Sequence, residues 1–177
     1  MRVQLIAAFV FLASALAAQA PSDERFYQAV RNNDLAALRK LIAAEGVNAR
    51  DGLGQTPLML ASAFGSLDAV RALLAAGADA RAGSNAGVTA LHWAATSPEK
   101  TRALLDAGAD VDRRAPDGAT ALMKAVLWGD LETIDLLLAH GADVHALDRD
   151  GWSPLRIARA KGDHPAERRL TARGAAL

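Results

Sequence analysis

The chain has 177 residues, of which 51% are hydrophobic, a size and composition that suit one folded domain without disulfides or metals. Twenty basic and twenty acidic residues cancel, which argues against a nucleic-acid partner whose binding depends on neutralising phosphates. Cysteine is absent, so disulfides, thiolate zinc sites, cysteine nucleophiles and a lipid-bearing cysteine are excluded.

The N-terminal segment has the layout of a secretory signal peptide. A basic residue, Arg2, precedes an apolar run from Leu5 to Ala18, and polar residues follow Pro21. This run is shorter than the roughly twenty apolar residues that a stable membrane-spanning helix requires. We therefore expect residues 1–20 to be a cleavable signal peptide, and the mature protein to be exported without stable membrane insertion.

Two positions near the end of this segment fit signal-peptide cleavage. Cleavage could follow Ala17 or Ala20, because small residues precede both sites. Cleavage after Ala20 would make Pro21 the first residue of the mature protein, and we expect proline at that position to hinder cleavage. The high alanine content and the preference for arginine over lysine are typical of a GC-rich bacterial genome. The destination would then be the periplasm or the extracellular space, and the sequence leaves both open.

Two short motifs recur along the rest of the chain and indicate an internal repeat. The first motif occurs as Thr56-Pro57-Leu58-Met59, Thr89-Ala90-Leu91-His92, Thr120-Ala121-Leu122-Met123 and Ser153-Pro154-Leu155-Arg156. The second is a Gly-Ala step that begins at Gly77, Gly108, Gly141 and Gly174. Both motifs recur every 31 to 33 residues, so they belong to one repeating unit.

Each unit carries the signals that start and stop two helices. The Thr or Ser of the first motif is an N-cap, and Pro57 and Pro154 occupy the first helical position, where no N–H is needed. The second helix carries an apolar stripe with helical spacing, as in Leu67, Val70, Leu73 and Leu74, or Leu131, Ile134, Leu137 and Leu138. We predict that Gly77, Gly108 and Gly141 end this helix in a left-handed backbone conformation.

This order of turn, helix, helix and loop resembles the ankyrin repeat, whose signature is Asp-Gly-x-Thr-Pro-Leu-His, then Ala-Ala, Gly, Leu-Leu and Gly-Ala-Asp. We name the four matching units repeats one to four; they span residues 51–83, 84–115, 117–148 and 150–177. Residues 23–50 fit as an atypical N-terminal unit. The resemblance implies an all-α repeat solenoid over residues 21–177, with one β-turn and one antiparallel helix pair per unit. We expect a monomer.

Repeat two departs from this pattern in two ways. His92 is the only histidine at the fourth position of the first motif, so the hydrogen-bond network that this histidine usually forms between neighbouring turns is expected to be mostly absent. Two residues are missing between Ala95 and Leu104, where Ser97 can cap a helix that starts at Pro98. We predict a truncated first helix or connecting turn in repeat two, and the fastest amide exchange of the stack there.

Repeat four is crowded with basic residues, namely Arg156, Arg159, Lys161, Arg168, Arg169 and Arg173. A terminal unit of a repeat stack needs a polar outer face, because no further unit covers it. Two interpretations of this cluster stay open. It is either a solvated cap at the end of the stack or a patch that binds an acidic partner.

No group of residues is suited to catalysis or to metal binding. His92 belongs to the repeated turn motif, and His140 and His145 flank a Gly-Ala-Asp loop without a third ligand nearby in the sequence. Residues 148–151 resemble the start of a calcium loop but lack its further ligands and its closing glutamate. We therefore expect a protein that is not an enzyme and that has no metal and no cofactor.

The resemblance implies that function lies in the positions that vary between repeats, which are the turn tips and the exposed side of each first helix. Together these line a concave surface that binds proteins. The turn row is Gln55, Val88, Ala119 and Trp152, with Leu53, Asn85 and Arg149 beside it. The helix row is Phe64, Ser97, Trp128 and Lys161, extended by Arg31 and Asn32. Three aromatic side chains in these rows favour a protein interface.

Trp128 and Trp152 are predicted to anchor the partner. For Trp128 an alternative stays open, in which the side chain packs at the end of its helix and shields the stack. Trp93 is expected to be half buried. The leading hypothesis is a protein-binding module in the periplasm or the secreted space. The alternative is a secreted effector or inhibitor that blocks a specific enzyme with the same surface.

Overall fold

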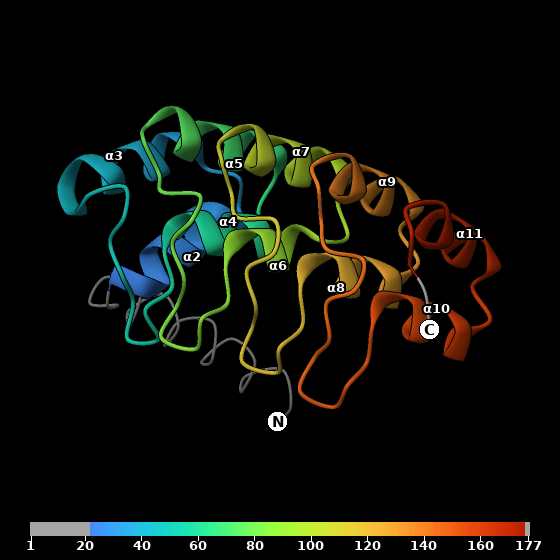
Figure 1. Ribbon diagram of the computed structural model, residues 1–177. Helices are drawn as coiled ribbons and strands as arrows, with labels where there is room; N and C mark the ends of the chain where they lie inside the picture. The colour runs from blue at the N-terminus through green and yellow to red at the C-terminus, as the bar shows by residue number, and fades with distance from the viewer. Residues whose placement is uncertain (1–21, 176–177) are drawn as a thin grey trace, which may run out of the picture.

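The computed structural model describes residues 22–175, and within them helices α2 to α11 form antiparallel pairs that stack side by side in two layers (Figure 1). The first layer holds α2 (Ser22–Arg31), α4 (Pro57–Phe64), α6 (Ala90–Ala94), α8 (Ala121–Trp128) and α10 (Pro154–Lys161). The second layer holds α3 (Leu35–Glu45), α5 (Leu67–Ala75), α7 (Pro98–Asp106), α9 (Leu131–Ala139) and α11 (His164–Ala172). The predicted signal peptide lies outside the described residues.

The predicted helix signals are confirmed. The hydroxyl oxygen of Thr56 accepts a hydrogen bond from the backbone N–H of Met59 at 3.4 Å, as expected of an N-cap. Gly77, Gly108 and Gly141 have φ angles of 89°, 85° and 84°, so each lies in the left-handed region, where a side chain would be strained. The N-cap residues and the left-handed glycines of the sequence therefore determine where the helices begin and end.

The hydrophobic core runs without interruption along the stack, between the two layers. Every repeat contributes fully buried leucines, which are Leu58, Leu73, Leu91, Leu104, Leu122, Leu137, Leu155 and Leu170. These come from both helices of each pair, so each repeat fills the apolar face of its neighbour. Stability therefore depends on how well adjacent repeats are joined.

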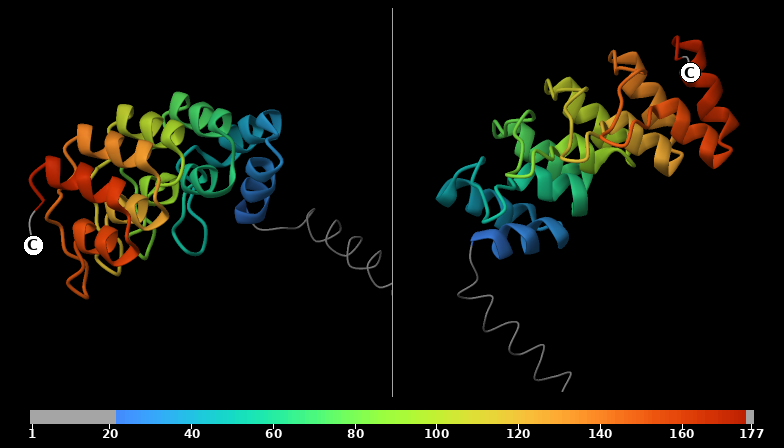
Figure 2. Two further views of the ribbon diagram at one scale, coloured as in Figure 1. Left: turned by 90° about the vertical axis from the view of Figure 1, so that its right-hand side faces the viewer. Right: turned by 60° about the horizontal axis from the view of Figure 1, so that its bottom comes forward.

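Each repeat begins with a five-residue hairpin, which we call a finger. Fingers 1 to 4 comprise residues 51–55, 84–88, 115–119 and 148–152. In each finger the N–H of the first residue donates to the carbonyl of the last, over 2.9 to 3.1 Å. In Figure 1 the fingers hang below the first-layer helices, and in both views of Figure 2 the repeats follow one another along one direction.

Three hydrogen-bonded contacts lie where finger 1 and α4 meet finger 2 and α7; in the first, Arg50, the residue before finger 1, reaches Gly83, the residue before finger 2. The guanidinium of Arg50 donates to the carbonyls of Gly54 and Gly83, at 2.9 and 2.8 Å. The N–H of Asn85 in finger 2 donates to the carbonyl of Leu53 in finger 1 at 3.0 Å. Lys100 extends from α7 to the carbonyl of Ser62 in α4, at 3.2 Å. These contacts hold fingers 1 and 2 together as a pair.

Fingers 3 and 4 are joined by an equivalent arginine and an equivalent backbone N–H, and a lysine at the end of α10 links this helix to α8. The guanidinium of Arg114 donates to the carbonyls of Gly118 and Leu147. The N–H of Arg149 donates to the carbonyl of Asp117 at 2.9 Å, and the ammonium of Lys161 reaches the carbonyl of Val126 in α8 at 3.3 Å.

At the junction between fingers 2 and 3, different residues stand at the positions of the arginine, of the backbone N–H donor and of Lys161. Gly83 stands where Arg50 and Arg114 stand, and it has no side chain to donate. Pro116 stands where Asn85 and Arg149 stand, and proline has no backbone N–H. Trp128 replaces Lys161 at the end of the first helix.

Other contacts keep repeats two and three joined. A ring nitrogen of His92, Nε2, lies 3.2 Å from the carbonyl of Ala119 in finger 3. In the loops between repeats, the N–H of Asp143 donates to the carboxylate of Asp112 at 2.8 Å, and α7 packs against α9. The contact between α6 and α8 is sparser than that between α4 and α6 or between α8 and α10. The first helix of repeat two, α6, has five residues, whereas α4, α8 and α10 have eight. The predicted truncation of repeat two is thus confirmed, in its first helix.

The basic residues of repeat four bind mainly within the stack. Lys161 donates to repeat three, and Arg169 pairs with Asp135 of α9, with Nε and Oδ2 2.9 Å apart. Arg173 reaches the carbonyl of Leu138 at 2.7 Å. These contacts favour the interpretation of repeat four as a cap.

Candidate functional site

The exposed side of the first-layer helices carries a row of aromatic rings that crosses repeat boundaries. Tyr27 of α2 meets Phe64 of α4 edge-to-face, with ring centroids 5.4 Å apart and planes inclined by 78°. Phe64 in turn lies 6.5 Å from Trp93 of α6. Trp128 of α8 continues the row and is 71% exposed. Such an exposed apolar row, built from four helices, marks a surface suited to binding another macromolecule.

Of the predicted helix row, Phe64 and Trp128 are exposed on first-layer helices, whereas Ser97 does not lie on one; the role of these residues in partner binding stays a prediction. Phe64 and Trp128 are 54% and 71% exposed at the ends of α4 and α8. Ser97 is instead the N-cap residue of α7, where its hydroxyl donates to the carboxylate of Glu99 at 3.3 Å. The two residues missing from repeat two shift the register, so this position has passed from the first helix to the start of the second.

Sequence reasoning missed two members of the aromatic row, Tyr27 and Trp93. Trp93, expected to be half buried, keeps 44% of its surface exposed and lies beside Phe64. Its neighbour His92 is buried, so the alternation of a buried and an exposed residue along α6 is the signal that could have revealed it.

The residues of the predicted turn row lie at the bases of the fingers. The amide of Gln55 donates to the carboxylate of Asp51 at 3.1 Å, and Val88 is half buried in finger 2. Trp152 is 37% exposed, and the guanidinium of Arg156 lies over its ring at 4.8 Å. Trp152 is therefore packed in part against its own repeat.

The tips of the fingers carry the neighbouring predicted residues. Leu53 is 68% exposed at the tip of finger 1, and Asn85 and Arg149 are exposed on fingers 2 and 4. The backbone N–H groups of Asn85 and Arg149 hold the finger pairs together, which leaves their side chains at the surface. Leu53 is the one large apolar side chain among the finger tips, since Ala86, Asp117 and Asp150 stand at the same position in the other fingers.

A groove of about 580 Å³ opens between repeats two and three, at the junction where the finger contacts are missing. It is lined by residues that include Val88, His92, Trp93, Pro116, Lys124 and Trp128. Trp93 comes from α6 and Trp128 from α8, so each repeat contributes one indole. The groove lies where α6 and α8 make only a sparse contact.

His92 forms the buried part of the groove and is held in the neutral state. Burial lowers the pKa of His92 below its ordinary value of 6.5, the hydrogen bond to Ala119 opposes this shift, and the positive charge of Lys124 adds to it. The N–H of Thr89 donates to Nδ1 at 3.1 Å, which assigns the ring proton to Nε2 and makes Ala119 the acceptor. Both ring nitrogens are thus occupied within the protein.

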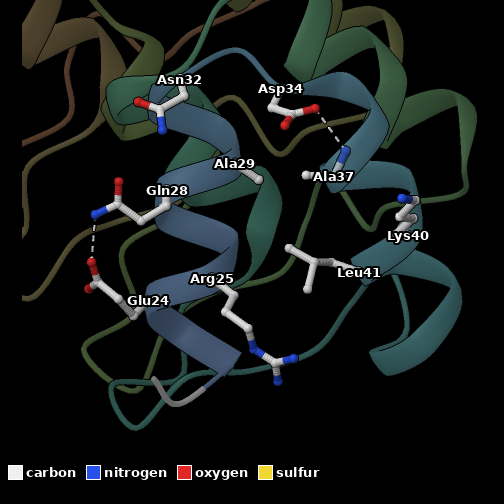
Figure 3. Close-up of a pocket in the computed structure, with 9 residues that line it drawn as sticks. All are labelled: Glu24, Arg25, Gln28, Ala29, Asn32, Asp34, Ala37, Lys40 and Leu41. Carbon is white, nitrogen blue, oxygen red and sulfur yellow. Dashed lines mark hydrogen bonds between the residues drawn. The ribbon is translucent and has the colours of Figure 1, made fainter. Parts of the chain in front are cut away.

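A second hollow, of about 380 Å³, lies between α2 and α3 in the N-terminal unit (Figure 3). Its polar side chains bond to their own helices: Gln28 donates to Glu24 at 2.6 Å, and Asp34 accepts the N–H of Ala37 at 2.9 Å. A terminal unit requires such a polar face.

Neither a metal site nor a membrane-spanning helix is found in residues 22–175. In that part of the chain no three histidine, aspartate or glutamate side chains are close enough together to hold a metal ion. None of the helices described there has the length and apolar character needed to cross a bilayer.

Comparison with known protein families identifies the class. A family model described as "Ankyrin repeats (3 copies)" matches residues 26–115 and 98–175, so the chain belongs to the ankyrin-repeat family. Proteins of this family are in general interaction modules rather than enzymes.

Curated relatives match shorter segments. Protein phosphatase 1 regulatory subunit 27 of mouse and of human is 46% and 47% identical over 54 residues, which is 30% of this chain and 35% of each relative. Notch-regulated ankyrin repeat-containing protein of Xenopus tropicalis is 49% identical over 43 residues, which is 24% of this chain and 37% of that protein. The chain thus matches little more than a third of the length of these relatives, and all three species are eukaryotes.

Proposed function

We propose that the protein is exported and binds a protein partner through its concave surface, made of the aromatic row, the groove and the fingers. The observation that carries the proposal is the row of aromatic rings that runs from the half-buried Tyr27 through the exposed Phe64, Trp93 and Trp128, in a chain with only 5% aromatic residues. Aromatic residues are enriched at protein interfaces, and tryptophan is prominent among the residues that dominate binding energy.

Capture of the partner from native extracts, followed by affinity measurement with variants, tests this proposal. Trp128→Ala should weaken binding by about 2 kcal/mol or more if this indole is an anchor, and should change stability little because the side chain is 71% exposed. Arg102→Ala, on the exposed side of α7 in the opposite layer, is the matched control. Equal affinities for Trp128→Ala and Arg102→Ala would contradict the proposed surface. A large loss of stability in Trp128→Ala would show that this residue shields the stack instead.

Export to the periplasm or the secreted space is the second part of the proposal. It is supported by the basic, apolar and small residues of segment 1–20. Mass spectrometry of the native protein tests it: a mature N-terminus at Ala18 or Pro21 is expected. An intact Met1 in a cytosolic fraction would contradict export.

An enzyme is a second candidate for the partner, which would make the protein an inhibitor or effector. The name of the mouse and human relatives, a regulatory subunit of a protein phosphatase, favours this candidate. The test is the activity of the captured enzyme with and without an equimolar amount of this protein. Unchanged activity would leave a binding module without inhibitory function.

A further inference from the structure

The groove between repeats two and three presents more hydrogen-bond donors than acceptors. The indole N–H of tryptophan only donates. Within residues 22–175 neither Trp93 nor Trp128 has an acceptor for its indole N–H. Lys124 adds an ammonium group, and its nearest carboxylate, Asp117, lies 4.0 Å away and is largely exposed. Three donor groups in this groove are therefore available to a ligand.

The remaining lining of the groove adds mainly apolar surface. Val88, Ala95, Ala115 and Pro116 contribute no polar side-chain atom, and Thr96 adds one hydroxyl, which can donate or accept. Both ring nitrogens of His92 are already bonded, to Thr89 and Ala119. The carboxylate of Asp117 is the one charged acceptor among the lining residues. A complementary ligand is rich in carbonyl oxygens, poor in N–H groups, apolar and flat enough to pack on indole rings.

We propose that this groove binds an extended, proline-containing segment of the partner that carries a carboxylate beside the prolines. Proline has no N–H that would be buried without an acceptor, while its carbonyls accept from the two indoles. Proline-rich segments are already extended before binding, so they lose little conformational entropy in aromatic-lined grooves. The carboxylate pairs with Lys124. This inference rests on the proposed function and specifies its partner.

Other backbone conformations complement the groove less well. An α-helix uses its carbonyls internally, which leaves the two indole N–H groups without acceptors. A β-strand without proline brings one N–H for every carbonyl, and the groove has few groups to accept them. The surplus of donors therefore selects a chain segment that lacks N–H groups.

The peptide acetyl-Pro-Pro-Glu-Pro-Pro-amide is the probe for the first test, which uses the indole N–H signals in nitrogen-15 NMR spectra of the whole protein. The signals of Trp93 and Trp128 should shift and saturate as the peptide is added. The signal of Trp152, which lies outside the groove lining, serves as the internal reference. The control peptide acetyl-Ala-Ala-Glu-Ala-Ala-amide should bind at least about fivefold more weakly, because it introduces unpaired N–H groups. Equal binding of the two peptides would overturn the proposal.

Two variants test the donors separately. Trp128→Phe keeps an aromatic ring but removes the indole N–H, and should weaken binding of the probe about 2- to 10-fold; Arg102→Ala, on α7 in the opposite layer, is the control and should have no effect. Replacing the glutamate of the probe by glutamine should weaken its binding to the parent protein. The same replacement should not change the affinity for the Lys124→Gln variant, which has no ammonium group to pair with the carboxylate. If the captured partner still loses affinity in Trp128→Ala while the probe shifts no indole signal, the proposed function stands and the proline-segment inference is rejected.

Discussion

Fingers 1 and 2 are joined in the same way as fingers 3 and 4, whereas fingers 2 and 3 are not. In the two closed junctions an arginine before the first finger reaches the carbonyl of the residue before the second finger, and a backbone N–H of the second finger donates to the first; at the junction of fingers 3 and 4, Lys161 also reaches α8. In the open junction the equivalent residues are Gly83, Pro116 and Trp128. The groove lies at this open junction, so one repeat pattern provides both rigid contacts and a space for a ligand.

The largest effect is expected from breaking the contact that remains on the finger side of the open junction. His92→Ala should lower the free energy of unfolding by about 2–4 kcal/mol, because it leaves a cavity and removes the buried partners of Thr89 and Ala119. Urea denaturation measures this. His145→Ala, an exposed histidine, should stay within roughly 0.5 kcal/mol of the parent protein. Equal losses in the two variants would show that His92 does not join the repeats.

The closed junctions can be broken in parallel. Arg50→Ala and Arg114→Ala should each cost about 1–2 kcal/mol in thermal or urea unfolding, because each removes two hydrogen bonds to carbonyls of neighbouring fingers. Arg102→Ala removes an exposed arginine that joins no fingers and serves as the control. If all three variants unfold alike, the arginine contacts do not distinguish the junctions.

The open junction can be closed by design. A Cβ at Gly83 would meet no neighbouring atom closer than 3.6 Å, so a side chain fits there. Gly83→Arg should place a guanidinium near the carbonyls of finger 2 and finger 3 and stabilise the protein by about 0.5–1 kcal/mol more than Gly83→Ala. The alanine variant isolates the gain from a less flexible unfolded chain. Equal stabilities of the two variants would mean that no new contact forms.

The smallest effect on the free energy of unfolding is expected from a change of pH. Burial lowers the pKa of His92 in the folded protein, so below its ordinary value of 6.5 the unfolded chain binds more protons than the folded one. Stability should therefore fall as the pH drops from 6.5 towards the lowered pKa. Denaturation at pH 7.5 and 5.5 checks this, and the difference should shrink in His92→Gln. Glu167 titrates in a separate range, because its hydrogen bond to Arg159 lowers its pKa below 4.5.

The local features of the fold could be predicted from the sequence. N-caps, left-handed glycines and apolar stripes act within one helix or turn, so Thr56 and Gly77 took the predicted roles. The shortened first helix of repeat two was also predictable, because a spacing of 31 instead of 33 residues has to remove part of an element. The expected fast amide exchange of residues 94–103 relative to 125–138 stays a prediction, which exchange mass spectrometry would check.

The arrangement of the site could be predicted only in part. Phe64 and Trp128 were found because their position in the repeat is exposed, but Ser97 was misplaced, since a motif count does not show which element loses the missing residues. The meeting of Tyr27, Phe64 and Trp93 depends on the curvature of the stack, which no short-range pattern encodes. The pairing of fingers could not be predicted, because the sequence does not show which carbonyl oxygens the side chains of Arg50 and Arg114 reach.

The pairing of fingers has a consequence for engineering with these repeats. A cut between residues 82 and 83 would separate Arg50 from the carbonyl of Gly83 and Leu53 from the N–H of Asn85. A cut between fingers 2 and 3 severs neither contact, because Gly83 and Pro116 form no equivalent contact there. Two consecutive repeats, rather than one, are therefore the natural module to transplant, duplicate or delete when this stack is lengthened or recombined.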